Sequence, residues 1–378
     1  MQINERLKNY RNYLENNNIE GTFILNPDLQ FYLSGFKALM YSRPIVLYID
    51  KKKSSIVVPG LEEFHANEEA DVDEVYAYYE HPNPRGEELN HFEFIKKILK
   101  SLPTNSNIGV DLDSTPGDII LLIKNSGNNL VDVGEKITEL KFIKENQEIE
   151  LMKKSGKLVE TAVDETLKAI KAGTTEMEID AVGNAALFAE VADKYPDATL
   201  DMFVMSPSGP RRSNMPHVFS NTRKLENGDV LIHSRQVGLN GYRAELERTV
   251  IIGEPTNEQK KAFEAARIAQ QVAIDVIKPG IRASEVDSKA REVFEKDGFS
   301  KYAIHRTGHG IGVSAHEKPF LRYDNHELIL KEGMAFSIEP GIYIPDVGGF
   351  RHSDTIIVTS DGCEVITEYP RDLRNLTF

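Results

Sequence analysis

The stretch GDVLIHSRQVGLNGYRAELERTV (residues 228–250) decides the fold of this chain. Three later stretches accompany it: HRTGHGIGVSAHE (305–317), FSIEPGIYI (336–344) and GGFRHSDTIIV (348–358). Residues 244–249 read as a strand, on which side chains two positions apart share a face, so we expect Glu245 and Glu247 to point the same way. Charged and polar groups on strands and strand ends are held rigidly, as a catalytic site requires.

Together these stretches resemble the creatinase/aminopeptidase superfamily, which includes Xaa-Pro dipeptidases, Xaa-Pro aminopeptidases, methionine aminopeptidases and the metal-free creatinases. In its metallopeptidases, two aspartates, one histidine and two glutamates bind two divalent ions. The corresponding positions here are Ser234 (with His233 as its neighbouring option), Glu245, His309, Glu339 and Ser353. Serine hydroxyls are poor ligands for hard cations. This degenerate set therefore predicts weak metal binding or none, and no cofactor.

Further matches favour a creatinase-like site. The segment ELERT resembles creatinases, in which the glutamate at the Glu247 position holds a substrate guanidinium, whereas metallopeptidases commonly have threonine there. His217 falls at the histidine that creatinases use as general base and acid. We expect Arg235 to compensate the charge of Glu245, and His305 and His352 to be structural or exposed. The predicted catalytic residues are His217, Glu247, Glu339, His316 and His309.

The resemblance also implies substrate-binding residues. Tyr41 and Arg43 match the aromatic and arginine positions of the creatinase N-terminal domain, where the arginine pairs with the substrate carboxylate across a dimer interface. A second carboxylate-binding arginine of that family falls at Phe320 here. The replacement for that contact stays open among three arginines, Arg211, Arg212 and Arg322.

Three functions follow, in order of preference. The first is a metal-independent, creatinase-like hydrolase of a C–N bond in a small guanidino, amidino or amide substrate that carries a carboxylate. The second is a metal-dependent Xaa-Pro dipeptidase or aminopeptidase with altered ligands, which binds one or two Mn, Co or Zn ions. In that case Glu245, His309, Glu339 and His233 would hold an ion. The third is a catalytically inactive binding protein that has kept the fold.

Length and pattern predict two domains in the 378 residues. Residues 1–140 alternate helical stretches with β-branched runs, which predicts an α/β creatinase-like N-terminal domain. Residues 141–378 contain a repeat, AIKAGTTEMEID (169–180) against VIKPGIRASEVD (276–287), which predicts two helix-turn-helix units. The resemblance names the resulting α+β domain the pita-bread fold.

Composition and charge indicate where the protein works and which partners it binds. The formal net charge of −14 argues against nonspecific nucleic-acid binding. No apolar run approaches the roughly 18 residues that span a bilayer. The charged N-terminus reads as an amphipathic helix, and the single cysteine, Cys363, excludes an intramolecular disulfide. We expect a cytoplasmic enzyme that acts on a small molecule or short peptide, and the role implied for Arg43 adds a homodimer.

Overall fold

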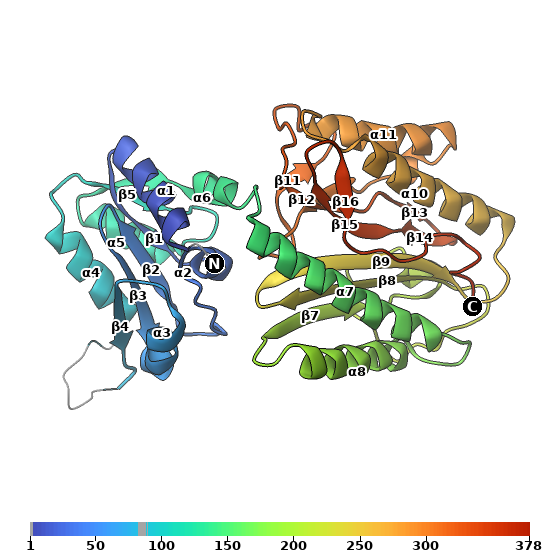
Figure 1. The fold of residues 1–378 in the computed structure, drawn as a ribbon, viewed down its shortest axis with the longest axis horizontal. Coiled ribbons are helices and arrows are strands. Elements are labelled where there is room, and N and C mark those ends of the chain that lie inside the picture. The colour runs from blue at the N-terminus through green and yellow to red at the C-terminus, as the bar shows by residue number, and fades with distance from the viewer. Residues whose placement is uncertain (1–2, 82–87, 89) are drawn as a thin grey trace. The chain divides into compact units, whose positions relative to one another are not determined.

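Two large sheets organise the chain, one in each of two compact units (Figure 1). The computed structural model describes residues 3–81, 88 and 90–378. The units span Met1–Lys141 and Phe142–Phe378. Among the described residues, no helix combines the length and the apolar character needed to cross a bilayer.

The first unit is a mixed sheet flanked by helices. Its elements are α1 (Ile3–Asn16), β1 (Ile19–Ile24), α2 (Pro27–Ser34), β2 (Val46–Asp50), β3 (Ser54–Pro59), the 3-10 turn η1 (Gly60–Glu62), α3 (Glu63–Glu69), β4 (Glu74–Tyr78), α4 (His91–Ser101), β5 (Asn107–Val110), α5 (Gly117–Asn125), β6 (Asn129–Asp132) and α6 (Gly134–Leu140). The strand order is β4-β3-β2-β1-β5-β6. Phe23 and Val110 from the sheet pack with Ile95 and Ile119 from the helices. The inner strands are apolar because helices cover them, which confirms the predicted α/β character.

The second unit is built around an eight-stranded antiparallel sheet. Its elements are α7 (Asn146–Lys168), α8 (Glu176–Lys194), β7 (Leu200–Met205), α9 (Gly209–Arg212), β8 (Val230–Leu239), β9 (Tyr242–Ile251), α10 (Asn257–Val276), α11 (Ala283–Lys296), the 3-10 turn η2 (Ser300–Tyr302), β10 (Gly308–Gly310), β11 (Glu317–Leu321), β12 (Ala335–Ile338), β13 (Gly341–Ile344), β14 (Gly348–Arg351), β15 (Ser353–Val358) and β16 (Cys363–Val365). The strand order is β11-β10-β12-β15-β9-β8-β7, with β16 paired to β15, and β13 and β14 form a separate hairpin. Helix α7 packs on β8 and β9, and α10 packs on β12 and β14.

A tight turn sets the register of the two longest strands, β8 and β9. Only the Asn-Gly pair at 240–241 lies between them, with φ angles of 48° and 86°. These are the torsions of a type I′ turn, for which Asn-Gly is the favoured sequence. The resulting register places Ser234 opposite Glu247 and Gln236 opposite Glu245.

Two helical hairpins, α7–α8 and α10–α11, share the same local structure, as the sequence repeat predicts. Gly173 and Gly280 follow α7 and α10, each with φ of 93°. Their N–H groups donate to the carbonyls of Leu225 (2.8 Å) and Leu330 (2.9 Å). Figure 1 shows α8 and α11 at opposite margins of this unit, while α7 crosses the sheet in front of β8 and β9. The predicted α+β domain with two helical hairpins is confirmed.

Candidate active site and metal centre

Three buried glutamates meet where β9, β12 and β15 lie side by side. Glu245 and Glu247 share one face of β9, and Glu339 directly follows β12. One carboxylate oxygen from each lies within 4.8 Å of the others. Each of the three residues is only 2% exposed. Carboxylates that are this close and this buried require cations beside them.

Arg351, at the end of β14, supplies one such cation. Its Nε and Nη2 donate to the two oxygens of Glu247 at 2.5 and 2.6 Å, and its Nε lies 3.5 Å from Oε2 of Glu339. Burial raises the pKa of Glu247 to about 7, and the guanidinium opposes that rise. Because an arginine stays charged in proteins, the two-pronged contact is a buried ion pair. An internal cation thus occupies the carboxylate that we expected to hold a substrate guanidinium.

Neutral donors surround Glu245. Gln236 Nε2 donates to Oε2 at 2.5 Å, and Ser353 Oγ donates to Oε1 at 2.7 Å. Ser337 Oγ donates to the same Oε1. The serine at the last predicted ligand position therefore acts as a hydrogen-bond donor to the neighbouring ligand position.

His309 projects from β10 into this cluster. Its Nδ1 lies 2.9 Å from the carbonyl of Gly310, and since a carbonyl only accepts, Nδ1 carries a proton. Its Nε2 lies 3.2 Å from Oε1 of Glu339 and 3.8 Å from Oε2 of Glu245. Burial lowers the pKa of His309, but Glu339 and Glu245 outweigh it and raise the pKa to about 9. The Nε2 edge of the ring therefore faces the carboxylates.

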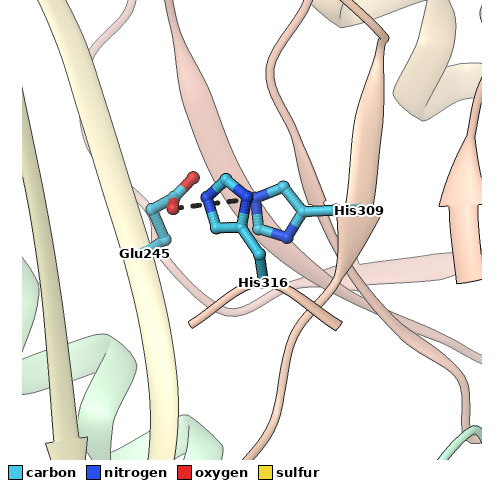
Figure 2. Close-up of side chains that lie close together, drawn as sticks. All are labelled: Glu245, His309 and His316. Atoms are coloured by element: carbon cyan, nitrogen blue, oxygen red, sulfur yellow. Dashed lines mark ion pairs between the residues drawn. The ribbon is translucent and has the colours of Figure 1, made fainter. Parts of the chain in front are cut away.

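His316 lies over His309, as Figure 2 shows. The ring centroids are 3.8 Å apart and the planes differ by 20°. Its Nδ1 lies 3.2 Å from Nη2 of Arg306. Because the arginine can only donate, the neutral imidazole carries its proton on Nε2. Burial, followed by the charge of His309, lowers the pKa of His316 to about 4, so His316 is a neutral donor facing Glu245.

Two further histidines border the cluster. His305 Nε2 lies 3.9 Å from Oε1 of Glu339, although the sequence suggested a structural or exposed residue. His217 is exposed, on the segment between α9 and β8. Burial, followed by the charge of Arg351, lowers the pKa of His217 against the opposing effect of Glu339. His217 is therefore close enough to feel the charges of the cluster and stays neutral near pH 7.

The alternation of β8 separates its side chains into two sets. Gln236 reaches Glu245, and Ser234 is on the same face, two residues away. His233 and Arg235 belong to the opposite face, where His233 Nδ1 lies 2.8 Å from Ser206 Oγ and Arg235 donates to helix α8. The expectations that His233 replaces Ser234 as a ligand and that Arg235 compensates Glu245 are therefore wrong.

The predicted substrate-binding positions belong to different units. Tyr41 and Arg43 belong to the first unit, in the segment between α2 and β2, where Tyr41 is 85% exposed and Arg43 pairs with Glu80 at 2.8 Å. Phe320 belongs to β11 of the second unit and lies under Arg306, with the guanidinium 4.3 Å from the ring centroid. Their roles as substrate contacts stay predictions.

The three candidate arginines differ in how far they are already engaged. Arg212 is paired with Glu176 at 2.8 Å, and Arg322 with Asp324 at 2.5 Å. Arg211 is exposed beside a cavity of about 480 Å³. Acidic neighbours therefore hold two of the three in place.

Several residues of the site were missed from the sequence: Gln236, Ser337, Arg351, Arg306 and His305. One signal was available, because several glutamates in apolar strands call for a buried cation. All but Ser337 and Gln236 carry or can carry a positive charge, and all five lie within the four quoted stretches. The choice among them depended on side-chain directions that the sequence pattern does not contain.

The donor set fits one divalent ion and does not fit two. Nε2 of His309 and Oε1 of Glu339 are buried atoms that lack a well-formed hydrogen bond, although they lie 3.2 Å apart, and Nε2 lies 3.8 Å from Oε2 of Glu245. When His309 is neutral, as an imidazole that binds a metal must be, three carboxylates and the guanidinium of Arg351 leave two negative charges, which one divalent ion balances. Ser234 and Ser353 bring no charge to the positions that a second ion would need.

Comparison with known proteins places this site in a family. Residues 150–360 match the model of metallopeptidase family M24, and residues 6–143 match the creatinase/prolidase N-terminal domain. The chain is 31% identical over 376 residues to the putative dipeptidase YkvY of Bacillus subtilis, which covers 97% of this chain and 99% of that protein. It is also 31% identical over 374 residues to the Xaa-Pro dipeptidase of Pyrococcus furiosus, covering 98% and 100%.

Solved structures of prolidases are similar to this chain over its whole length. The prolidase of Thermococcus sibiricus superposes with a TM-score of 0.87 at 28% identity, covering 100% of both chains. The prolidase of Pyrococcus horikoshii superposes with a TM-score of 0.84 at 28% identity, covering 98% of this chain and 99% of that one. The two predicted folds, the α/β N-terminal domain and the pita-bread domain, are confirmed.

These comparisons correct two predictions. A metal-independent, creatinase-like function and the absence of a metal cofactor are wrong, because the matching family is one of metallopeptidases and the full-length relatives are named Xaa-Pro dipeptidases. The prediction of weak metal binding or none rested on the two serines, Ser234 and Ser353. The buried carboxylate and imidazole groups that remain still fit one ion. The expected class of enzyme, a hydrolase of C–N bonds, is confirmed. The chain belongs to metallopeptidase family M24 and carries the creatinase/prolidase N-terminal domain.

Proposed function

We propose that the protein is a metal-dependent Xaa-Pro dipeptidase that works with a single divalent ion. The observation that carries the proposal is the buried set of Glu245, His309 and Glu339, in which two unpartnered atoms, Nε2 of His309 and Oε1 of Glu339, lie 3.2 Å apart beside Glu245. The full-length similarity to proteins named Xaa-Pro dipeptidases supports the substrate class. The substrate would be a dipeptide with proline in the second position.

Glu245, His309 and Glu339 would hold the ion. When bound, a divalent ion polarises the scissile carbonyl and lowers the pKa of a coordinated water towards neutrality. The bond from Nδ1 of His309 to the Gly310 carbonyl orients the ring so that Nε2 faces Glu339 and Glu245, where it could bind an ion. Ser353 and Gln236 fix the Glu245 carboxylate in the same way.

Two neutral histidines would serve the reacting peptide. His316 presents its Nε2 proton towards the cluster and would donate to the oxygen on which negative charge develops. His217, which is neutral and exposed, would take a proton from the attacking water and return it to the leaving proline nitrogen. Glu247 stays with Arg351 and keeps the net charge of the site matched to one ion.

The oligomeric state, the cellular location and the partners are also part of the proposal. We expect a homodimer, in which the exposed Tyr41 and the half-buried Arg43 of one subunit would serve the other subunit's site. A cytoplasmic location and the lack of nucleic-acid and membrane partners rest on the net charge of −14 and on the composition.

The test combines cleavage with metal content. Purified protein is stripped of metal, reloaded separately with manganese, cobalt or zinc, and assayed on Ala-Pro, with Pro-Ala and Ala-Ala as control peptides. We expect cleavage of Ala-Pro alone, and about one ion per chain by elemental analysis.

Matched variants sharpen the test. Glu339→Gln removes a ligand charge and should abolish both metal retention and cleavage, whereas Glu332→Gln, at an exposed position, should change neither. If the metal-loaded protein cleaves no Xaa-Pro peptide, the proposal fails and the inactive binding protein remains. Two retained ions per chain would refute the single-ion part.

A further inference from the structure

The guanidinium of Arg306 stands beside the candidate site without an acidic partner. Arg306 lies on the loop before β10 and is half-buried. Its Nη2 contacts Nδ1 of His316 at 3.2 Å, and its Cζ lies 4.3 Å from the ring centroid of Phe320. Its Nε is buried and makes no hydrogen bond to any described residue.

Several other arginines of the second unit have an acidic partner. Each of four has a carboxylate close by: Arg351 with Glu247 at 2.5 Å, Arg212 with Glu176 at 2.8 Å, Arg322 with Asp324 at 2.5 Å, and Arg243 with Asp201 at 2.5 Å. Arg306 forms no ion pair with any of the described residues. A half-buried guanidinium remains charged, and the glutamates Glu339 and Glu245 act on it without forming an ion pair, so its free N–H groups can accept a carboxylate from outside the chain.

The surroundings hold the Arg306 guanidinium in one place. Phe320 supports its flat face, and the pairing of β10 with β11 fixes Phe320 opposite His309. His316 accepts a hydrogen bond from one edge and in turn lies over His309, 3.8 Å away. A planar guanidinium that is supported in this way presents its remaining N–H groups as a fork for a carboxylate.

We infer that Arg306 binds the C-terminal carboxylate of the dipeptide and so selects substrates that end one residue after the cleaved bond. The inference rests on the proposed function. His316 contacts both groups: its Nδ1 lies 3.2 Å from Nη2 of Arg306, and its ring centroid lies 3.8 Å from that of His309. One peptide residue spans roughly 3.5 Å. A proline attached at the cleaved bond thus extends about as far as the guanidinium. A longer peptide or an amide offers no negative charge there.

The experiment separates ligand binding from cleavage. Calorimetry measures the affinity of the metal-loaded protein for proline, the expected product, and for prolinamide, which lacks the carboxylate. Wild type should prefer proline. Arg306→Gln should weaken proline binding by roughly 10- to 100-fold, the effect of losing a charge-assisted contact, and leave prolinamide unchanged.

Two variants control for indirect effects. Arg306→Lys keeps the charge without the fork and should recover part of the preference, and Arg374→Gln, at an exposed position, should behave as wild type. Metal content should be unchanged in all three. Steady-state cleavage of Ala-Pro and Ala-Pro amide by the same proteins should show the loss in KM for the free acid.

The outcomes are distinct. If wild type and Arg306→Gln show the same preference for proline over prolinamide, the role of Arg306 is refuted even when Ala-Pro is cleaved. If the preference depends on Arg306 but no Xaa-Pro peptide is cleaved, the proposed function fails and the carboxylate site stands.

Discussion

Removal of the Arg351 side-chain charge tests whether this guanidinium stabilises the buried negative charge of Glu247. In Arg351→Met a buried carboxylate, Glu247, loses both of its bonds of 2.5 and 2.6 Å. Tyr343 also loses the donor at 3.0 Å. Both members of the ion pair are about 2% exposed, so water does not replace the lost contacts. Breaking such a pair from one side costs about 3–5 kcal/mol of unfolding free energy.

The double variant isolates the cause. Arg351→Met combined with Glu247→Leu removes the unpaired charge and returns the cluster to two negative charges, those of Glu245 and Glu339. Replacing both members of a buried pair by apolar residues is often neutral or stabilising. We therefore expect the double variant to recover most of the lost stability, and to bind one ion as wild type does.

The assay is urea unfolding of the metal-free proteins, followed by circular dichroism. An exposed pair serves as the control: Arg267 lies 2.8 Å from Glu264, and Arg267→Met should cost roughly 0–1 kcal/mol. A loss below about 1 kcal/mol in Arg351→Met would refute the argument that Glu247 depends on this guanidinium. So would a double variant no more stable than the single one.

Two more predictions concern the serines and the cysteine. Ser234→Asp combined with Ser353→Glu restores carboxylates at the two neutral positions, so elemental analysis should find two ions per chain in place of one; a count still at one would mean that charge is not what limits the site. Burial raises the pKa of the Cys363 thiol from 9.0 to about 11, which lowers its thiolate fraction near pH 8 by roughly 100-fold. A chromogenic disulfide reagent should therefore react about that much more slowly with folded protein than with protein in urea, and equal rates would contradict the burial of this thiol.

Local patterns accounted for much of the fold and part of the site. The period of two on β9 predicted that Glu245 and Glu247 share a face, and their carboxylates do lie together. The repeat around Gly173 and Gly280 predicted two equivalent helical hairpins. The same period of two along β8 places Arg235 on the face opposite to Ser234 and Gln236, away from Glu245.

The sequence by itself determined the two folds, the repeat and the positions from which the site is built. Periodicity along the chain predicted the α/β pattern and the two helical hairpins, and the resemblance to a known family implied the pita-bread fold and the site positions. Only the tertiary structure decided which charges meet. Arg351 reaches Glu247 from 104 residues away, and Arg306 finds Phe320 through the pairing of β10 and β11. The net charge of the site, which sets the number of ions it can bind, depends on such contacts through space. Side-chain spacing along a strand does not encode these contacts.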